Sequence, residues 1–471
     1  MEKYICFLVI IRVIYLKQMF INSLKTHSLL SNVLIFLIGI FLAASCGIQD
    51  SSPASYTPIV TSQIITPSAQ ISNTATPNDH PSTLDKWDLW VGSTQLRGAN
   101  IWQRIVIPDL DGAEFLGSNY VGPPYTQEDF NRLASLGANY VNISGPGLFT
   151  EEPPYQLDLQ VQAHLDQLLN MIQKADLFAV ITFRTGPGRS DFTFYRDGAG
   201  DWFDPGLLRE WVWTDLTAQD AWVEMWSYTA SRYQGHPVVV GYDLMCEPNA
   251  AGIHGIWEPE DFYRDYAGTT LDWNQLYPKI TLAIREVDLE TPILIGGMGW
   301  SSVRWLGHLE PTGDSRTVYI VHQYEPQQEY THQENHSPQN SYPGEFDLDW
   351  DGIPDSFNQI WLDNYLFAID EFQDEWGMPV AVNEYGIVRW VPGGAKFLDD
   401  QLALFEERGL NHAIWMWDPY WEPWTSDVNA MNYRFGVKPG AKIEQMPNVL
   451  MDIIQKYWNL NTIRPSDFYP R

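Results

Sequence analysis

The most informative stretch of the sequence is Val238-Val-Val-Gly-Tyr-Asp-Leu-Met-Cys-Glu247-Pro-Asn249. It begins as a short apolar run, which is typical of a buried strand, and it ends at a carboxylate. The stretch Pro379-Val-Ala-Val-Asn-Glu384-Tyr-Gly386 repeats this design farther along the chain. In a barrel of parallel strands, polar residues at the carboxyl ends of the strands converge on one mouth. Two strands that both end in glutamate therefore predict a barrel with a site at its mouth.

Similar apolar runs recur through the chain and alternate with longer amphipathic stretches. The predicted strands are Leu96–Ile101, Tyr140–Ser144, Phe178–Phe183, Val238–Met245, Pro292–Gly296, Val318–Tyr324, Val380–Glu384 and His412–Trp417. The predicted crossover helices are Thr126–Leu136, Leu157–Ala175, Ala218–Tyr233, Trp273–Val287, Ile360–Trp376 and Lys396–Arg408. This alternation favours an α/β fold, a closed (β/α)8 TIM barrel, over an open doubly wound sheet. No glycine-rich phosphate motif follows the first strand, which disfavours the open sheet further.

The overall composition excludes some classes of partner. The chain has 471 residues, with 28 Lys and Arg against 59 Asp and Glu, so its formal net charge is −31. This charge opposes binding to a phosphate backbone or an anionic membrane surface, and we expect no nucleic-acid partner. Apolar residues make up 45% and charged residues 18%, which is a globular balance. The 21 Trp and 24 Tyr exceed what packing needs and suit stacking on sugar rings.

The N-terminal part of the chain differs from the rest. Residues 1–45 are predicted to be a signal peptide, and the true start of translation is Met1 or Met19. The ending Ala43-Ala-Ser-Cys46 resembles a bacterial lipoprotein cleavage site, at which Cys46 would carry the lipid. Ordinary secretion is the alternative. We expect a secreted protein or a surface lipoprotein whose only membrane contact is the lipid at Cys46.

The remaining chain divides into a linker and a folded body. Residues 46–86 are rich in Ser, Thr and Pro and are expected to form a flexible tether. Residues 87–471 are expected to form one catalytic domain. That domain contains a single cysteine, Cys246, so an internal disulfide framework is excluded.

Glu247 and Glu384 are the candidate catalytic pair. Hydrolysis of a glycosidic bond needs one protonated carboxyl group for the leaving oxygen and one ionised carboxylate that attacks the sugar or activates water. Two glutamates at the ends of different strands of one barrel can supply both groups. The alternative is that each pairs with an arginine and supports the rim of the barrel.

Six short motifs lie on the predicted strands in chain order. They are Leu96-Arg-Gly-Ala-Asn100, Gly137-Ala-Asn-Tyr-Val141, Gly241-Tyr-Asp-Leu-Met-Cys-Glu-Pro248, Val321-His-Gln-Tyr324, Asn383-Glu-Tyr-Gly386 and Trp415-Met-Trp417. Together they resemble glycoside hydrolase family 5, the cellulase-type family of retaining enzymes in clan A. The resemblance implies that Glu247 is the general acid/base and Glu384 the nucleophile. It also implies that His322 and Tyr324 orient the nucleophile and that Trp417 stacks under the sugar.

Three positions depart from the family pattern. Cys246 stands where the family has an asparagine that binds the sugar 2-hydroxyl, and a thiol is a weak donor. Asn142 replaces the arginine that supports the nucleophile from the second strand. Arg184 replaces a histidine on the third strand, and it either reaches Glu384 or forms an ion pair at the rim. The chain is therefore identified as a divergent member.

Two further candidates have structural alternatives. His322 could be a hydrogen-bonded core residue, but Tyr324 at the same strand end favours a role in the site. Trp300 lies in the loop after a predicted strand, where it would either line the substrate cleft or pack against the body. We expect Tyr324, with Arg184 as a second donor, to hold Glu384 ionised.

The segment Asp347-Leu-Asp-Trp-Asp-Gly-Ile-Pro-Asp-Ser-Phe-Asn358 resembles a calcium-binding loop. Its carboxylates at positions one, three, five and nine are Asp347, Asp349, Asp351 and Asp355, with glycine at position six. Asn358 replaces the bidentate glutamate of position twelve. The alternatives are one structural Ca²⁺ and a solvated acidic turn. No cofactor is expected for catalysis.

The leading functional hypothesis is a retaining glycoside hydrolase that cleaves a β-linked polysaccharide, of the cellulase, β-glucanase or mannanase type. The substrate would be a polysaccharide or oligosaccharide. One alternative is a β-glycosidase acting on small glycosides or glycolipids. The other is a non-catalytic carbohydrate-binding barrel, which the three departures suggest and the retention of both glutamates opposes. The sugar, its linkage and endo or exo action stay open.

Overall fold

The computed structural model describes residues 85–92, 94–198, 202–333, 339–419 and 430–469. Contacts within the chain divide it into two units, residues 1–78 and 79–471, and all described residues belong to the second. The predicted signal peptide, Cys46 and nearly all of the predicted tether lie outside the described residues.

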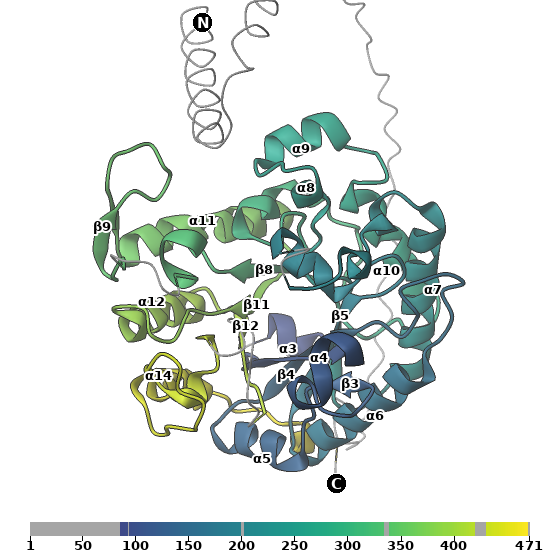
Figure 1. Ribbon diagram of the computed structural model, residues 1–471, viewed down its shortest axis with the longest axis horizontal. Helices are drawn as coiled ribbons and strands as arrows, with labels where there is room; N and C mark the ends of the chain where they lie inside the picture. The colour runs from purple at the N-terminus through teal and green to yellow at the C-terminus, as the bar shows by residue number, and fades with distance from the viewer. Residues whose placement is uncertain (1–84, 93, 199–201, 334–338, 420–429, 470–471) are drawn as a thin grey trace, which may run out of the picture. The chain divides into compact units, whose positions relative to one another are not determined.

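Eight parallel strands close into a barrel (Figure 1). In chain order they are β1 (Arg97–Trp102), β4 (Tyr140–Pro146), β5 (Phe178–Thr185), β6 (Val239–Asp243), β7 (Ile293–Gly296), β8 (Thr317–Gln323), β11 (Val380–Tyr385) and β12 (Asn411–Ile414). Neighbours around the barrel follow this order, and β12 pairs with β1 to close it. Each predicted strand is present, so the predicted TIM barrel is confirmed.

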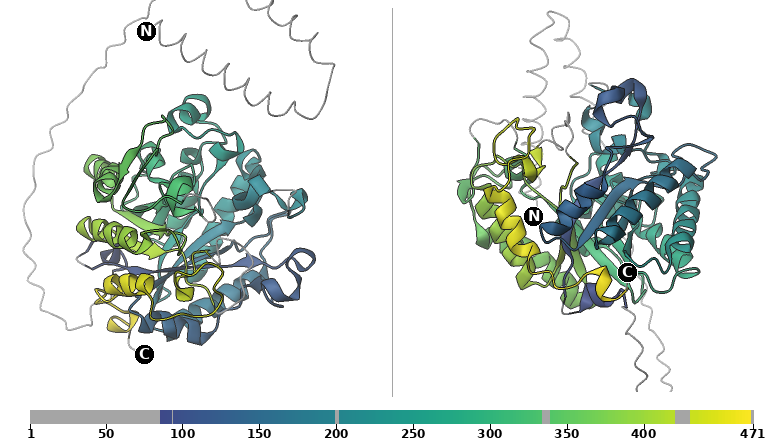
Figure 2. Two further views of the ribbon diagram at one scale, coloured as in Figure 1. Left: turned by 60° about the vertical axis from the view of Figure 1, so that its left-hand side comes forward. Right: turned by 90° about the horizontal axis from the view of Figure 1, so that it is seen from below.

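Helices surround the barrel (Figures 1 and 2). They are α5 (Gln127–Ser135), α6 (Leu159–Lys174), α7 (Leu216–Tyr233), α10 (Tyr277–Arg285), α11 (Gln359–Trp376), α12 (Gly394–Glu407) and α14 (Val449–Trp458). All except α14 correspond to predicted crossover helices; α14 follows β12 and packs on α12 and β1. Side-chain caps begin several of them: Asp158 and Asn358 each accept two backbone N–H groups at the starts of α6 and α11.

Smaller elements occupy the loops between the strands and the ends of the body. The short helices are α3 (Asp88–Val91), α4 (Pro108–Phe115), α8 (Ala250–Ile253) and α9 (Pro259–Tyr266). The two hairpins are β2 (Arg104–Ile105) with β3 (Val121–Gly122), and β9 (Gly344–Phe346) with β10 (Asp355–Phe357). The 3₁₀ turns are η2 (Asp191–Gly198), η3 (Pro205–Leu207), η4 (Trp211–Trp213), η5 (Trp273–Gln275), η6 (Val303–His308), η8 (Tyr433–Phe435) and η9 (Pro465–Asp467), and η7 (Gln327–Thr331) is a π-turn. The long loops after β1, β5, β6 and β8 surround the carboxyl ends of the strands, where the site lies.

The barrel interior is layered because alternate residues of each strand point inward. The layer nearer the amino-terminal end is apolar and includes Tyr140, Phe178, Val180, Val240, Leu294, Val318, Ile320, Ala381 and Ala413. Two residues farther along β4, β5 and β11, the inward side chains are Asn142, Thr182 and Asn383, all at most 2% exposed. The barrel thus changes from apolar to polar directly before its mouth.

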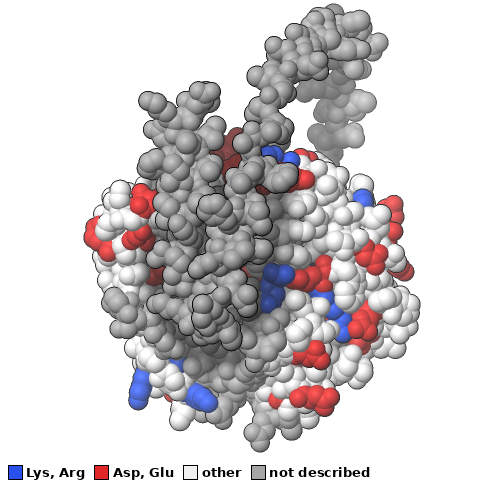
Figure 3. Space-filling model, turned by 45° about the horizontal axis from the view of Figure 1, so that its top comes forward, with Lys and Arg blue, Asp and Glu red and all other residues white. Residues whose placement is uncertain are grey.

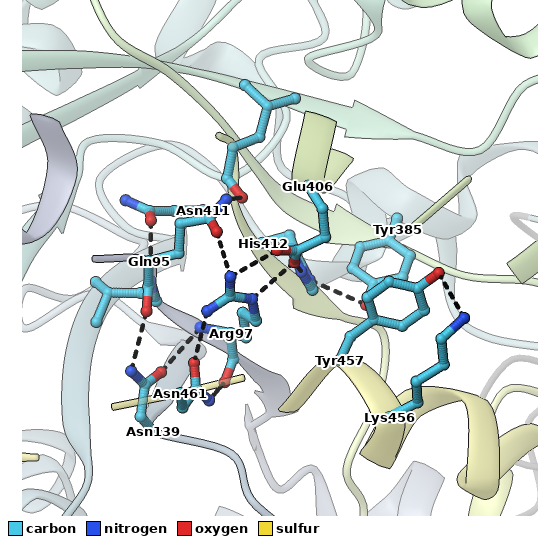
Figure 4. Close-up of polar contacts among 12 residues, drawn as sticks. Gln95, Arg97, Asn139, Tyr385, Glu406, Asn411, His412, Lys456, Tyr457 and Asn461 are labelled. Carbon is cyan, nitrogen blue, oxygen red and sulfur yellow. Dashed lines mark hydrogen bonds and ion pairs between the residues drawn. The ribbon is translucent and has the colours of Figure 1, made fainter. Parts of the chain in front are cut away.

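A polar cluster ties the amino-terminal end of the barrel to the last segment of the chain (Figure 4). The Nε of Arg97 on β1 donates to Oε1 of Glu406 on α12 at 2.7 Å, and its Nη1 donates to Oδ1 of Asn461 at 3.2 Å. Asn461 donates in return to the carbonyl oxygens of Arg97 and Gly137. The buried His412 of β12 lies 3.3 Å from the same Glu406 oxygen. These contacts join the ends of β1 and β12 to α12 and the C-terminal residues.

Acidic side chains outnumber basic ones in this chain, 59 to 28, and many of them lie on the surface. Acidic side chains are spread over the face shown in Figure 3, and basic ones lie singly or in small groups between them. Within the described part of the chain, no helix has both the length and the apolar character needed to span a bilayer.

Candidate active site

Glu247 lies in the turn after β6, at the carboxyl end of the barrel. Its backbone is left-handed, with a φ of 53°, a conformation that costs a non-glycine residue about 1–3 kcal/mol and is concentrated at functional sites. Arg189 holds this turn, because its guanidinium donates to the carbonyl oxygens of Cys246 at 2.7 Å and Glu247 at 2.8 Å. The strained turn directs the Glu247 carboxylate toward β8.

Glu384 lies within β11 and is only 4% exposed. The hydroxyl of Tyr324 donates to its Oε1 at 2.7 Å. Burial and the charge of Glu384 raise the pKa of Tyr324 far above its ordinary value, so the phenol stays protonated and remains a donor. The other carboxylate oxygen, Oε2, is buried without a hydrogen-bond partner among the described residues.

His322 on β8 lies between the two glutamates. Its Nδ1 is 2.8 Å from Oε1 of Glu247 and 3.7 Å from Oε2 of Glu384. Its backbone N–H donates to the carbonyl oxygen of Ser301 at 2.8 Å, which fixes the strand end. One nitrogen of His322 and one oxygen of each glutamate all lie within 4.8 Å of one another. The structure therefore brings together the four residues expected at the centre of the site.

Burial and the neighbouring charges shift the pKa values of the groups in this cluster. Burial raises the pKa of Glu384 to about 7, although the charges of His322 and Arg184 and the bond from Tyr324 oppose the rise. Tyr324 and Arg184 both favour the ionised form of Glu384, as expected, while desolvation opposes them. Burial would lower the pKa of His322, but Glu384 and Glu247 outweigh it and raise that pKa to about 9.

Arg184 forms an ion pair, which is the second of the two alternatives expected for it. It affects Glu384 only through its charge. Its Nε donates to Oδ1 of Asp191 at 3.0 Å, and its guanidinium carbon lies 3.8 Å from the centre of the Phe194 ring. Both partners of the ion pair are buried. Among the described residues no hydrogen bond joins Arg184 to Glu384, so its positive charge lowers that pKa through space only.

The other two departures from the family pattern are buried in the wall of the site. Cys246 is 1% exposed, with its Sγ 3.7 Å from Nη1 of Arg184 and 3.9 Å from Oγ of Ser144. Burial raises the pKa of this thiol far above its ordinary value. Asn142 donates to Asn100 and accepts from Thr182, so it belongs to the polar layer below the glutamates.

Trp417 does not lie where the sequence predicts it. Its ring is 2% exposed, its Nε1 donates to the carbonyl oxygen of Asp129 at 3.1 Å, and the guanidinium of Arg434 covers its face at 4.5 Å. Because β12 ends at Ile414, strand alternation no longer governs the residues that follow it. Trp415 instead faces the site wall, 5.4 Å from the guanidinium of Arg184.

Trp300 is fixed beside the turn that carries Glu247. Its backbone N–H donates to the carbonyl oxygen of Pro248 at 3.1 Å, and its indole stacks on that of Trp257 with a centroid distance of 5.3 Å and an angle of 12°. Gly252 permits this packing, because a Cβ there would lie 2.1 Å from the Trp300 ring. Trp257 is 59% exposed, so the pair presents an open aromatic surface.

Sequence reasoning missed four residues that the structure adds to the surroundings of the site: Trp257, Trp415, Arg189 and Asp243. Two of them carried a signal in the sequence: Asp243 is a carboxylate inside the apolar run Val238–Met245, and Trp415 belongs to the motif Trp415-Met-Trp417. The other two are placed by loops whose course no periodicity predicts.

The structure gathers three of the four acidic residues of the predicted calcium loop. One carboxylate oxygen each of Asp347, Asp349 and Asp355 lies within 4.8 Å of the others. Asp351 is outside this group, and its Oδ1 accepts from the backbone N–H of Ile353 at 2.7 Å. Oxygen ligands of this kind suit Ca²⁺, which takes six to eight of them, so backbone carbonyls or waters would complete the shell.

Comparison with known proteins agrees with this geometry. The family model described as Cellulase (glycosyl hydrolase family 5) matches residues 97–420. Endoglucanase C of Acetivibrio thermocellus is 22% identical over 315 residues, which cover 62% of this chain and 83% of that protein. An endoglycoceramidase of Cyanea nozakii is 33% identical over 116 residues, 23% of this chain and 21% of that protein.

Solved structures share the fold. A glycoside hydrolase crystal structure has a TM-score of 0.56 at 22% identity, covering 77% of this chain and 99% of that one. Cel5A of Thermotoga maritima, solved with mannotriose, has a TM-score of 0.52 at 19% identity, covering 79% and 100%. With the family match extending over most of the barrel and both glutamates at its mouth, the chain belongs to glycosyl hydrolase family 5 and is a glycoside hydrolase.

Proposed function

We propose that the protein hydrolyses a β-linked glucan or mannan with retention of anomeric configuration, with Glu384 as nucleophile and Glu247 as general acid/base. The observation that carries this proposal is the spacing of at most 4.8 Å between one oxygen of each carboxylate. Retaining enzymes have carboxyl groups about 5–5.5 Å apart, whereas inverting enzymes need about 6.5–9.5 Å to admit a water. The short spacing supports direct attack on the sugar.

In the first step, the free Oε2 of Glu384 attacks the anomeric carbon. The bond from that carbon to the leaving oxygen breaks, and Glu247 delivers its proton to this oxygen. Tyr324 keeps its bond to Oε1, which selects Oε2 as the attacking atom. The product is a glycosyl ester on Glu384 and a free hydroxyl on the departing sugar.

In the second step, Glu247 acts as a base. It removes a proton from water, whose oxygen attacks the anomeric carbon and displaces Oε2 of Glu384. His322 lies close to both carboxylates, so it holds them in position relative to each other while the proton moves onto and off Glu247. Two displacements at one carbon restore its original configuration.

The relatives support a β-linked polysaccharide as substrate. Endoglucanases are among them, and Cel5A was solved with both cellobiose and mannotriose, hence the choice between glucan and mannan. The alternative of a glycolipid substrate has one specific support, the exposed Trp257 on Trp300, which could hold an apolar aglycone, together with the partial similarity to endoglycoceramidase. The presence of both Glu247 and Glu384 argues against the other alternative, a barrel that only binds carbohydrate.

The test measures the anomeric configuration of the first product released from each of several substrates. Residues 79–471 are incubated with β-glucans, mannans, xylans, aryl β-glycosides and glucosylceramide, and the anomeric proton of the first product is followed by NMR. We expect a β product from a glucan or mannan. An α product would overturn the retaining mechanism, and release of sugar from glucosylceramide alone would favour the glycolipid alternative.

A further proposal concerns the N-terminus of the mature protein. We propose that the mature protein is a bacterial surface lipoprotein with its lipid on Cys46, supported by the sequence around that residue. Mass spectrometry of the mature N-terminus decides between lipidation and ordinary secretion.

We also propose that the loop with Asp347, Asp349 and Asp355 binds one structural Ca²⁺, supported by their proximity.

A further inference from the structure

A chain of hydrogen bonds crosses the polar layer of the barrel, one residue before Glu384. Its direction is set at Asn100, whose Nδ2 faces the backbone carbonyl oxygens of Asn383 (2.8 Å), Ala413 (3.2 Å) and Ile414 (3.4 Å). Carbonyl oxygens only accept, so the amide NH₂ must point at them and Oδ1 must point away. That Oδ1 accepts from Nδ2 of Asn142 at 2.7 Å.

The orientation of Asn142 then determines that of Thr182. Because Asn142 uses its NH₂ toward Asn100, its Oδ1 is the atom that accepts from Oγ1 of Thr182 at 2.6 Å. A hydroxyl group has one proton, so Thr182 has none left to donate. Yet Oδ2 of Asp243 lies 3.2 Å from the same hydroxyl oxygen. The Asp243–Thr182 contact is a hydrogen bond only if the proton comes from Asp243.

We propose that Asp243 is a protonated carboxylic acid in the folded enzyme, at pH values at which an exposed aspartate is ionised, and that it is a positioning residue for Glu384. Its proton is donated to Thr182, and the chain continues through Asn142 and Asn100 to the carbonyl oxygen of Asn383. The side chain of Asn383 closes the ring by donating to Oδ2 of Asp243 at 2.9 Å. Five side chains from five strands thus hold the backbone directly before Glu384.

Burial supports the neutral state of Asp243. The residue is 0% exposed, and its Oδ1 is buried without a hydrogen-bond partner among the described residues. An unpartnered oxygen costs far less on a neutral carboxyl group than on an ion. Burial raises the pKa of Asp243 to about 6, and it outweighs the opposing effects of His322, Asn383, Thr182 and the backbone N–H of Met245.

The groups around Asp243 explain what its ionisation would change. His322 on β8 is the cation that faces it, Thr182 on β5 and Asn383 on β11 are its hydrogen-bond partners, and the Cys246 thiol interacts with it from the turn after β6. Ionised Asp243 would add a third anion beside His322, which already faces Glu247 and Glu384. It would also lose its bond to Thr182, so the ring would open.

The first test measures stability and does not depend on the proposed function. Asp243→Asn is uncharged at every pH, as the proposed neutral acid is, and its NH₂ can donate to Thr182 from the position of Oδ2. The Asn383 amide, whose Oδ1 has no hydrogen-bond partner among the described residues, would turn to accept the second proton of that NH₂. A raised folded pKa means that wild type loses stability as the pH rises from the unfolded pKa to the folded one. We therefore expect the melting temperature of Asp243→Asn, relative to wild type, to increase between pH 4 and pH 7.

Asp288→Asn is the matched control. Asp288 is also buried, but its Oδ1 accepts from the backbone N–H groups of Glu290 and Thr291, and its pKa is lowered. Relative to wild type, this variant should lose slightly more stability as the pH rises from 4 to about 5, and its loss should be constant above that pH. If Asp243→Asn instead loses stability relative to wild type over this range, the carboxyl group is ionised and the proposal is overturned.

A second test detects the proton directly. The infrared difference spectrum of wild type minus Asp243→Asn at pH 5 should contain a protonated carboxyl C=O band, which disappears at pH 8. A pair of carboxylate bands at pH 5 in place of it would overturn the proposal. Other protonated carboxyl groups cancel in the difference between the two proteins.

The third test addresses positioning and rests on the proposed function. Thr182→Val breaks the chain with little change in shape, so we expect kcat to fall about tenfold or more with little change in KM. Thr182→Ser and Asp243→Asn should retain most of the kcat, and Asp243→Asn should lose one ionisation from the alkaline limb of the pH profile. If the kcat of Asp243→Asn falls as far as that of Thr182→Val, catalysis requires the charge of Asp243 and the proposal fails. A protein without hydrolase activity would leave the first two tests valid.

Discussion

The hydroxyl of Tyr324 donates to Oε1 of Glu384 at 2.7 Å, while Oε2 of the same carboxylate has no hydrogen-bond partner among the described residues. One bond therefore distinguishes two chemically identical oxygens. The bound oxygen is oriented, and the free one remains available to attack. Since burial raises the pKa of Glu384 to about 7, the Tyr324 bond also helps to keep its carboxylate ionised.

Tyr324→Phe should lower kcat by about 10²-fold, the loss typical of one preorganised donor. The nucleophile must be ionised, so activity rises as the pH increases through the pKa of Glu384. Removing a donor to the carboxylate raises this pKa further, and the acid limb of kcat/KM should move to higher pH. The pH profile of the variant on an aryl glycoside measures the shift. An acid limb at an unchanged pH would show that Tyr324 does not support Glu384.

The two glutamate variants should respond differently to azide. With Glu247→Ala, a substrate whose leaving group needs no proton should still form the intermediate, and azide should intercept it as a β-glycosyl azide. Glu384→Ala should be inactive on that substrate, and azide should restore turnover only as an α-glycosyl azide. NMR of the azide products distinguishes the two. The opposite assignment would exchange the roles of Glu247 and Glu384.

The aromatic pair Trp257 and Trp300, beside the turn that carries Glu247, should determine affinity for a long substrate. Trp257→Ala should raise KM for a long oligosaccharide about tenfold, the value of roughly one aromatic contact, with kcat little changed. Trp417→Phe is the control, because its ring is covered and should affect melting temperature without changing KM. Initial rates on a short and a long substrate provide the measurement. An equal effect of Trp257→Ala on both lengths would exclude an extended platform.

Glu406 should contribute to stability in a pH-dependent manner. Its hydrogen bonds to Arg97 and His412 outweigh burial and lower its pKa to about 2. A lowered pKa gives stability that is fully present above the unfolded pKa of about 4.5 and is lost as the pH falls toward 2. Glu406→Gln should therefore cost about 3 kcal/mol at pH 7, the scale of breaking a buried pair, and less below pH 4.

Denaturant unfolding of Glu406→Gln at pH 7 and pH 3 measures this difference. Asp265→Asn is the control, because the ion pair of Asp265 with Arg264 is exposed and should contribute nothing measurable. A loss that is the same at both pH values would mean that Glu406 acts through packing and not through its charge.

Calcium should raise the melting temperature if the acidic loop binds it, because a ligand that binds only the folded state stabilises it. Asp349→Ala should abolish the difference between calcium and chelator. Asp351→Ala should preserve much of it, since Asp351 lies outside the cluster. An equal melting temperature of wild type in calcium and in chelator would identify the segment as an acidic turn.

The barrel and the placement of two glutamates at its mouth could be predicted from sequence because both depend on local patterns. An apolar run of strand length is visible in a few residues, and a carboxylate at its end is placed at the mouth by the parallel topology alone. The positions of Glu247, Glu384, His322 and Tyr324 follow from three such strand ends, those of β6, β8 and β11. The strand pattern could not place Trp417, because it lies beyond the end of β12, where alternation no longer applies.

Short segments of the chain suffice to predict the number and order of the strands, the family and the four residues at the barrel mouth, because hydrophobic periodicity and strand-end motifs are local properties. Three features emerge only in the folded barrel: the pairing of Arg184 with Asp191, the rise in the pKa of Glu384 on desolvation, and the ring that joins Asp243 to Thr182 and Asn383. Those outcomes depend on distances between residues far apart in the chain and on the loss of water around them. Burial and long-range geometry arise only when the strands close into a barrel.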